Sequence, residues 1–301
     1  MKNYLTKISF FVLPILLTLV FLEFYIRSKP NDYSYKNKYL TENAKDIETL
    51  IIGSSHSFYG IDPQYFSMNT FNAAHVAQSL KWDYFIFDNF KDRMTNLKFL
   101  IIPISYFSLF YDLEGGDADW RIKDYKIYYD ADGPSWKYNF EILNRKIVPL
   151  VIHAYKLFSG EDHGINCTDL GFGKRTALVD IDMDTSGKTA AEIHTVENFD
   201  DYDSNIEILE KFIIDCRSMD VKVLLISLPS WETYRKHLKA DQLKKTVDAC
   251  LDLSGKYDNV VYYSFFNDRR FVLEDFANAD HLNDKGAEKI SRLLDALIVA
   301  P

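Results

Sequence analysis

Two short stretches near opposite ends of the chain carry serine and histidine in positions that suit nucleophilic chemistry. The first is Gly53-Ser54-Ser55, within "TLIIGSSHSFYG", where an apolar run stops at a glycine and continues into small hydroxyl residues. The second is "NADHLNDKG", where His281 comes just before a helical pattern. A serine is a weak nucleophile until a neighbouring base takes its proton. We therefore predict Ser55 as the nucleophile and His281 as its general base.

The residues just before His281 could orient its ring. Asn278 lies three residues upstream and Asp280 is adjacent. A side chain three residues before a histidine in a turn can reach Nδ1, which directs Nε2 towards the serine. We predict Asn278 in this role, with Asp280 or Asp275 as carboxylates that could replace it. A carboxylate stabilises the imidazolium better than an amide does.

The elements that must position these residues follow from hydrophobic patterning. Nearly continuous apolar runs predict strands buried on both faces, and stripes with helical spacing lie between them. This alternation predicts an α/β fold, a three-layer α/β/α sandwich with a central parallel sheet. The predicted strands are 48–53, 97–105, 221–229 and 259–266, with a possible fifth at 69–74, and the predicted helices are 82–90, 204–219, 238–254 and one that opens at Asn283-Asp284.

One long segment, 111–200, does not follow this alternation. It is too long for a plain connection between a helix and a strand. We predict an insertion over the carboxyl edge of the sheet, where ligands bind in open α/β folds. The predicted domains are an anchor at 1–30 and an α/β domain at 31–301 that contains the insertion.

The N-terminal segment predicts attachment to a membrane. The run from Ile8 to Ile26 is interrupted only by Pro14 and Glu23, and as a helix it nearly spans a bilayer core. No small-residue cleavage site follows it, so an uncleaved anchor is favoured over a signal peptide. The short N-terminal tail and the single large domain favour an extracytoplasmic body, periplasmic or on the cell surface. The basic residues that flank the span are nearly balanced and do not set its orientation.

Composition narrows the class of function. The net charge is −9, and no basic stripe points to nucleic acid. The three cysteines have no metal spacing, and Cys216 and Cys250 fall on or near apolar helix stripes, which predicts buried side chains. We expect neither a metal nor a cofactor.

The two end motifs together resemble the SGNH (GDSL-type) hydrolase family over about 47–110 and 204–299. The resemblance implies that Ser55 is the nucleophile, that Ser54 stands where aspartate is usual, and that His281 is the base. It also implies an oxyanion hole made by Ser55, by Ala74 in place of a glycine, and by Ser105 in place of an asparagine. Residues that could reach the cleft and contact substrate are His56, Trp231 and Tyr234, although local hydrogen bonding is the more common role for a residue such as His56.

With the anchor, the chain is most similar to one branch of that family, the membrane-anchored D-alanine transfer proteins and the O-acetyltransferases of exported polysaccharides. The resemblance implies an acyl-Ser55 intermediate and transfer to a glycan hydroxyl. It implies an acyl donor supplied by a separate multi-spanning membrane acyltransferase of the MBOAT class. Two alternatives stay open: a carbohydrate esterase or deacetylase of the same fold, and a glycan-binding scaffold with weakened catalysis.

Overall fold

The computed structural model describes residues 2–144, 147–160, 164–175 and 181–299. Contacts within the chain divide it into two compact units. Unit 1 contains Met1–Lys38 and Glu114–Asn166, and unit 2 contains Tyr39–Leu113 and Cys167–Pro301. This division differs from the predicted one. The 111–200 segment is split near Asn166, and its first part groups with the N-terminal region instead of forming one insertion.

Unit 2 is built on a five-stranded parallel sheet with the strand order β2-β1-β3-β4-β5. The strand order changes direction between β1 and β3, so these two neighbouring strands flank a topological switch point, as in other doubly wound folds. The predicted α/β class and parallel sheet are therefore confirmed, including the fifth strand. The strands are β1 (Thr49–Ile51), β2 (Thr70–Asn72), β3 (Phe99–Pro103), β4 (Lys222–Ser227) and β5 (Val260–Ser264).

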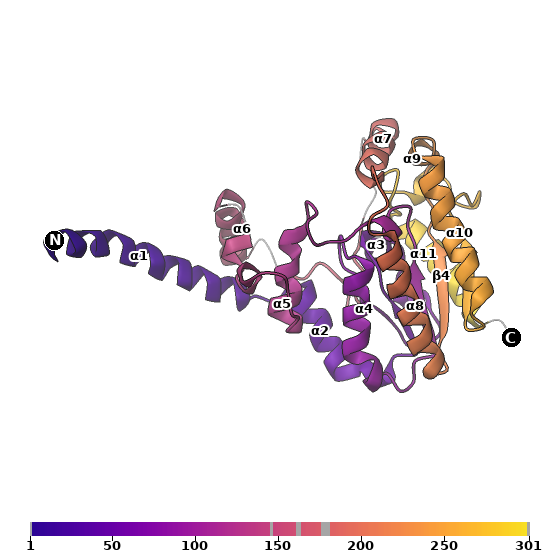
Figure 1. Ribbon diagram of the computed structural model, residues 1–301, viewed down its shortest axis with the longest axis horizontal. Coiled ribbons are helices and arrows are strands. Elements are labelled where there is room, and N and C mark those ends of the chain that lie inside the picture. Colours follow the sequence, from indigo (N-terminus) through magenta and orange to yellow (C-terminus); the bar gives the residue numbers. More distant parts are fainter. Residues whose placement is uncertain (1, 145–146, 161–163, 176–180, 300–301) are drawn as a thin grey trace. The chain divides into compact units, whose positions relative to one another are not determined.

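Helices cover both faces of this sheet (Figure 1). On one face, Ile290 and Leu294 of α11 join a buried cluster with Ile51 and Ile101 of the strands. Alternate strand residues point to the other face, where α4 and α8 pack together, as the ring contacts of Tyr84 and Phe212 show. The helices of unit 2 are α3 (Ser55–Gly60), α4 (Leu80–Phe90), α7 (Met183–His194), α8 (Tyr202–Ser218), α9 (Glu232–Arg235), α10 (Ala240–Lys256) and α11 (Asp284–Val299).

The predicted helices agree with this arrangement, with small shifts at their ends. Helix α10 ends at Lys256, two residues beyond the predicted end at 254. Cys216 and Cys250 are both fully buried on α8 and α10, as their stripes predicted.

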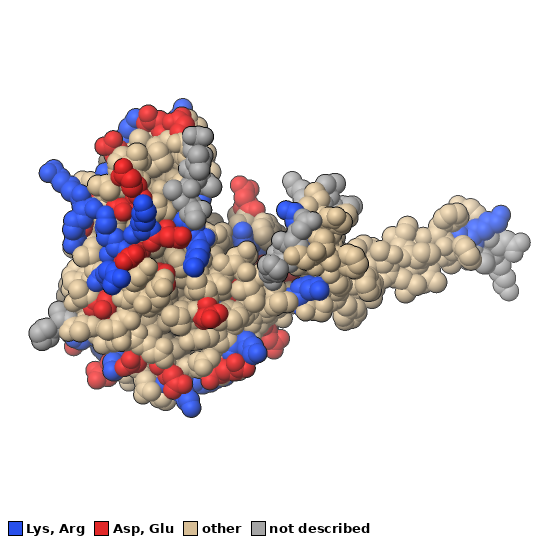
Figure 2. Space-filling view, turned by 180° about the vertical axis from the view of Figure 1, so that it is seen from behind, with Lys and Arg blue, Asp and Glu red and all other residues tan. Residues whose placement is uncertain are grey.

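Unit 1 contains the N-terminal helix α1 (Lys2–Arg27), α5 (Ile122–Tyr129) and α6 (Ile147–Ser159), and α2 (Asp32–Asn43) includes the boundary at Lys38. Within α1, the stretch Lys7–Arg27 has a mean hydropathy of 2.2 and is almost entirely unburied. Figure 2 shows its surface as tan along most of its length. It is long and apolar enough to span a membrane or to act as a signal sequence.

Candidate active site

Ser55 is the first residue of α3, directly after β1 and its following turn. Ser54 caps this helix, and its side chain accepts the backbone N–H of His56. The first N–H groups of a helix have no partner within the helix, so the Ser55 N–H points out of its N-terminus. The nucleophile candidate therefore sits at the carboxyl edge of the sheet, at the positive end of a helix.

A glycine is required in the turn that presents Ser55. Gly53 has a φ of 121°, a region that side chains rarely adopt, and a Cβ there would lie 2.3 Å from Ser57 Oγ. The Gly53 N–H donates to Asp83 Oδ1 at 2.6 Å, and Gln78 Nε2 donates to the same oxygen at 2.5 Å. Burial raises the pKa of Asp83 to about 7 despite these hydrogen bonds. This buried carboxyl, which sequence reasoning missed, holds the turn under Ser55.

His281 meets Ser55 directly. Its Nε2 lies 2.9 Å from Ser55 Oγ, although the two residues are 226 positions apart in the sequence. Burial lowers the pKa of His281 to about 4, while Asp280 opposes that shift. The ring is therefore neutral at pH 7, which is the state in which Nε2 can accept a proton from serine.

Two side chains approach His281 Nδ1. Asp280 Oδ2 lies 3.0 Å from it, and Asn278 Oδ1 lies 3.2 Å from it. Asn278 Oδ1 also accepts the backbone N–H of His281 at 2.8 Å, so it holds the loop as well as the ring. The Asn278 contact is the hydrogen bond to Nδ1, and the Asp280 carboxylate adds a charge contact that favours the imidazolium formed during the reaction. The geometry brings both predicted orienting residues together and gives Asp280 the shorter contact.

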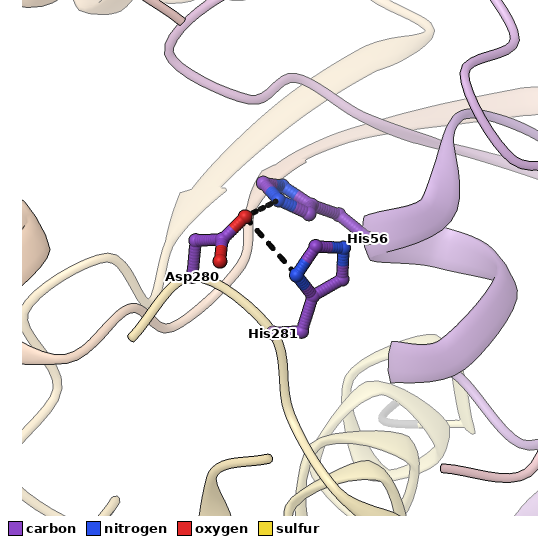
Figure 3. A group of neighbouring side chains, drawn as sticks. All are labelled: His56, Asp280 and His281. Carbon is purple, nitrogen blue, oxygen red and sulfur yellow. Dashed lines mark hydrogen bonds and ion pairs between the residues drawn. The ribbon is translucent and has the colours of Figure 1, made fainter. Parts of the chain in front are cut away.

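A second imidazole shares the Asp280 carboxylate (Figure 3). His56 Nε2 lies 3.3 Å from the same Oδ2 that faces His281, and the two rings pack edge to face at 4.6 Å. Burial disfavours a charge on Asp280, yet the two histidines hold the pKa of its carboxyl well below the usual range. His56 thus supports Asp280 instead of facing an open cleft.

The same three residues could be considered as metal ligands, since their ligand atoms all lie within 4.8 Å of one another. His56 Nε2 is already hydrogen-bonded to Asp280 Oδ2, and His281 Nε2 to Ser55 Oγ. His281 would therefore have to bind a metal through Nδ1. A ring metallated at Nδ1 keeps its proton on Nε2 and cannot accept one from Ser55. Metal binding and general-base function therefore exclude each other at this site.

Two of the three predicted oxyanion donors have other partners in this structure. The Ala74 N–H donates to Asn72 Oδ1 at 3.0 Å. Ser105 Oγ lies 2.7 Å from His56 Nδ1. A neutral His56 that donates from Nε2 to Asp280 must accept at Nδ1, so the Ser105 hydroxyl donates there. Of the three predicted donors, the Ser55 N–H points out of the N-terminus of α3. The Ala74 N–H and the Ser105 hydroxyl would have to break these hydrogen bonds before they could bind an oxyanion.

The predicted substrate contacts lie at different depths. Tyr234 is only 1% exposed, and its hydroxyl lies 2.9 Å from His194 Nδ1. It lines a cavity of about 80 Å³ behind the site, together with His56 and Asp280. Trp231 packs its ring against Phe276 at 5.6 Å and does not line that cavity. Tyr234 and His56 therefore line the cavity behind the catalytic candidates, and Trp231 packs against Phe276.

His194 is a residue that sequence reasoning missed. It ends α7 and packs against Phe107 at 4.3 Å and against His56 at 5.8 Å. Burial lowers its pKa to about 3, and His56 adds to that shift. No local pattern marked it, because its segment belonged to the unexplained 111–200 stretch.

An open groove of about 420 Å³ runs beside the loop that carries His281. Its other wall is α7, whose exposed hydroxyl side chains and Ile193 face it. The lining residues are Thr185, Ser186, Thr189, Ala190, Ile193, His194, Asn278, Asp280 and His281. This groove opens His281 and its two neighbours Asn278 and Asp280 to solvent.

Comparison with known proteins gives weak similarity. No family model matches the chain, and no curated protein matches it. Among solved structures, a putative acylhydrolase from Bacteroides fragilis has 9% identity and a TM-score of 0.42, covering 87% of this chain and 94% of its own.

Two further structures are similar at the same level. A putative platelet activating factor from Streptococcus pneumonia has 11% identity and a TM-score of 0.44, covering 96% of this chain and 99% of its own. A GDSL-like lipase from Bacteroides thetaiotaomicron has 10% identity and a TM-score of 0.41, covering 88% and 98%. At these identities and TM-scores the similarities carry no argument about activity, which rests on the residues of this chain.

Proposed function

We propose that the chain is a membrane-anchored, extracytoplasmic serine acyltransferase or esterase that works through an acyl-Ser55 intermediate. The observation that carries this proposal is the 2.9 Å contact between Ser55 Oγ and His281 Nε2, with Asp280 at 3.0 Å from Nδ1. Ser55, His281 and Asn278 thus form a continuous chain of hydrogen bonds, with the Asp280 carboxylate in charge contact with the ring, an arrangement that activates a serine.

The reaction follows from these contacts. Ser55 Oγ attacks the carbonyl carbon of an acyl ester while its proton passes to His281 Nε2. The tetrahedral oxyanion forms next to the Ser55 N–H, at the positive end of α3. Collapse breaks the bond to the leaving alcohol, which takes the proton from His281. An acceptor hydroxyl then gives its proton to His281 and attacks the acyl carbon. The bond to Ser55 Oγ breaks, and Ser55 takes the proton from His281, which restores the free enzyme.

A glycan hydroxyl is the acceptor we propose, in the cell envelope or on an exported polysaccharide. The groove beside His281 supports this, because it is open to solvent and carries Thr185, Ser186 and Thr189 on one wall. Hydroxyl side chains of this kind can exchange hydrogen bonds with sugar hydroxyls. An acetyl or other short acyl group is the group transferred.

The acyl donor in this proposal comes from a separate multi-spanning membrane acyltransferase of the MBOAT class. In the part of the chain that the structure describes, α1 is the one candidate membrane span. A single span cannot form a path that carries an acyl group across a bilayer, so a partner would have to do so.

The test is covalent trapping of the full-length protein with a fluorophosphonate, followed by mass spectrometry of the labelled peptide. We expect the label on Ser55 and its loss in Ser55→Ala. Ser57→Ala is the matched control, since Ser57 lies two residues further along the same helix and should leave labelling intact. A label absent from Ser55, or equal in Ser55→Ala, contradicts the proposal.

Hydrolysis is the second candidate, and the open groove favours it because water also reaches the site. Partition of a small acetyl ester between water and an added oligosaccharide separates the two. Acetyl-oligosaccharide as the main product supports transfer, whereas acetate formed at the same rate with and without oligosaccharide supports an esterase. Glycan binding without any Ser55 acylation would instead favour a scaffold.

A further inference from the structure

Unit 1 exposes large apolar side chains around the C-terminal end of α1. On α6, Tyr155 is 62% exposed and Phe158 is 80% exposed, and Trp136 on a preceding turn is 70% exposed. We call this set the collar: Trp136, Leu143, Val151, Ile152, Tyr155 and Phe158. Exposed apolar surface of this size marks an interaction site, since soluble surfaces rarely gather so many large apolar side chains.

Direct contacts fix α6 to α1. Ile26 of α1 packs with Leu150 and Leu157 of α6 in a small buried cluster. The ring of Tyr25 on α1 also meets that of Phe158 at 6.5 Å. The collar residues of α6 therefore lie beside the last turns of α1, with their apolar side chains turned outward.

Glu23 fixes the turns before α6 to the same end of α1. Its two carboxylate oxygens accept the backbone N–H groups of Glu141 and Ile142, each at 3.0 Å. Arg27, one turn further on, bonds to Glu23 at 2.5 Å and to the backbone oxygen of Asn139. Glu23 is thus buried inside unit 1 and satisfied by protein, so unit 1 covers one face of α1 from Glu23 onward, while Phe24 on another face is 68% exposed.

The stretch Lys7–Arg27 is long enough to span a membrane, but the part that unit 1 leaves uncovered on every side is shorter than a bilayer core. From Ile8 to Leu22 the helix rises about 22 Å, at about 1.5 Å per residue. A bilayer hydrocarbon core is about 30 Å thick. The mismatch disappears if the protein around the end of α1 enters the bilayer and supplies apolar surface there. The collar is the surface in that position.

We propose that the collar lies in the membrane, at the boundary between head groups and acyl chains on the side where α1 leaves the bilayer. Its partner is lipid, and α6 is a second membrane-contacting element. Trp136, Tyr155 and Phe158 are the amphipathic and aromatic side chains enriched at this depth. Lys156, exposed on α6, can extend its amine to the phosphates while its stem stays among apolar groups.

This inference rests on the anchoring by α1 that the proposed function includes, and it does not rest on the acyl chemistry. The two can therefore fail separately. Fluorophosphonate labelling of Ser55 reports on the chemistry, and the position of the collar in lipid reports on the anchor.

The experiment uses the full-length chain in phosphatidylcholine–phosphatidylglycerol vesicles, with single cysteines carrying a bimane fluorophore. Cys167→Ser supplies the background, because Cys216 and Cys250 are fully buried. Phe158→Cys is the test position, and Tyr155→Cys repeats the test if that variant misfolds. Phe21→Cys within α1 is the lipid reference, and Leu251→Cys, an apolar residue of α10 that is 55% exposed, is the matched control.

We expect nitroxide lipids with the spin label near the head group to quench the Phe158 label about as strongly as the Phe21 label. Aqueous iodide should quench only the Leu251 label. Iodide quenching of the Phe158 and Tyr155 labels equal to that of Leu251 overturns the proposal. Protection from both quenchers also overturns it, because protein would then cover the collar, and so does an intact mass that lacks α1.

Discussion

Each unit of the protein buries a network of charged and polar side chains, and the two networks end differently. In unit 1, the fully buried Lys123 amine pairs with the carboxylates of Asp124 and Glu141, and the Tyr128 hydroxyl donates to Glu141 at 3.0 Å. In unit 2, the network around Asp280 ends on Ser55 Oγ, and Asn278, Asp280 and His281 of this network line an open groove.

This difference shows what separates a structural network from a reactive one. The positive charge of Lys123 is paired with two negatively charged carboxylates, and this network contains no nucleophile, although Asp124, Tyr128 and Glu141 line a pocket of about 170 Å³. The network of unit 2 holds one carboxylate and two imidazoles, and its last member is a hydroxyl that can leave the hydrogen bond to attack a substrate. Buried charge alone therefore does not identify a site, whereas a network that ends on a nucleophile beside a groove does.

The largest expected effect concerns the orienting group of the reactive network. We predict that Asp280→Asn lowers the rate of Ser55 labelling by about 10⁴-fold, the loss known for such a change in serine triads. Asn278→Ala should cost about tenfold or less, since Asp280 still holds Nδ1. The rates of Ser55 labelling in both variants, from time courses quenched at intervals, measure these losses. Equal losses in the two variants would show that Asn278 orients His281 as much as Asp280 does.

The next effect tests whether the network of unit 1 is only structural. Lys123→Met removes the buried amine that pairs with both carboxylates, which should lower the free energy of unfolding by about 3 to 5 kcal/mol. Lys126→Met on the same helix is the control and should change it by about 0.5 kcal/mol or less. Denaturant titration measures both. Loss of Ser55 labelling in folded Lys123→Met would show that the two networks are coupled.

A smaller effect should follow from removing the second imidazole. His56→Leu takes one hydrogen bond from the Asp280 carboxylate, so we expect a loss of about 10- to 100-fold in labelling rate. His56 also lowers the pKa of His281, so its removal should move the pH midpoint of labelling upward. His56→Gln, which can still donate to Asp280, should recover most of the rate. An unchanged midpoint would reduce His56 to packing.

The smallest effect is the pH dependence of the intact site. Burial lowers the pKa of His281 to about 4, so the ring stays neutral and able to accept a proton at every pH above that value. As pH falls through about 4, the ring becomes charged and the rate should fall about tenfold per pH unit. Labelling rates between pH 3 and 8 check this, and a midpoint near 6.5 would mean a solvated ring instead.

Much of the fold followed from the sequence because buried parallel strands are nearly continuous in apolar residues. The runs at 97–105 and 221–229 contain β3 and β4, and the weak run at 69–74 contains β2. The 111–200 segment could not be assigned, since its parts are held by contacts far away in the chain. The Glu141 carboxylate pairs with Lys123 and its backbone N–H donates to Glu23 Oε1, and neither partner is visible in local patterning.

The sequence by itself determined the nucleophile and base candidates. Ser55 follows a strand and a glycine, and His281 precedes a helix, and both are local signals. Only the tertiary structure decided that the two side chains meet, that Asp280 lies closer to the ring than Asn278, and that His56 shares its carboxylate. The physical reason is that such contacts join residues from distant elements, and their distances depend on how the sheet and its loops pack.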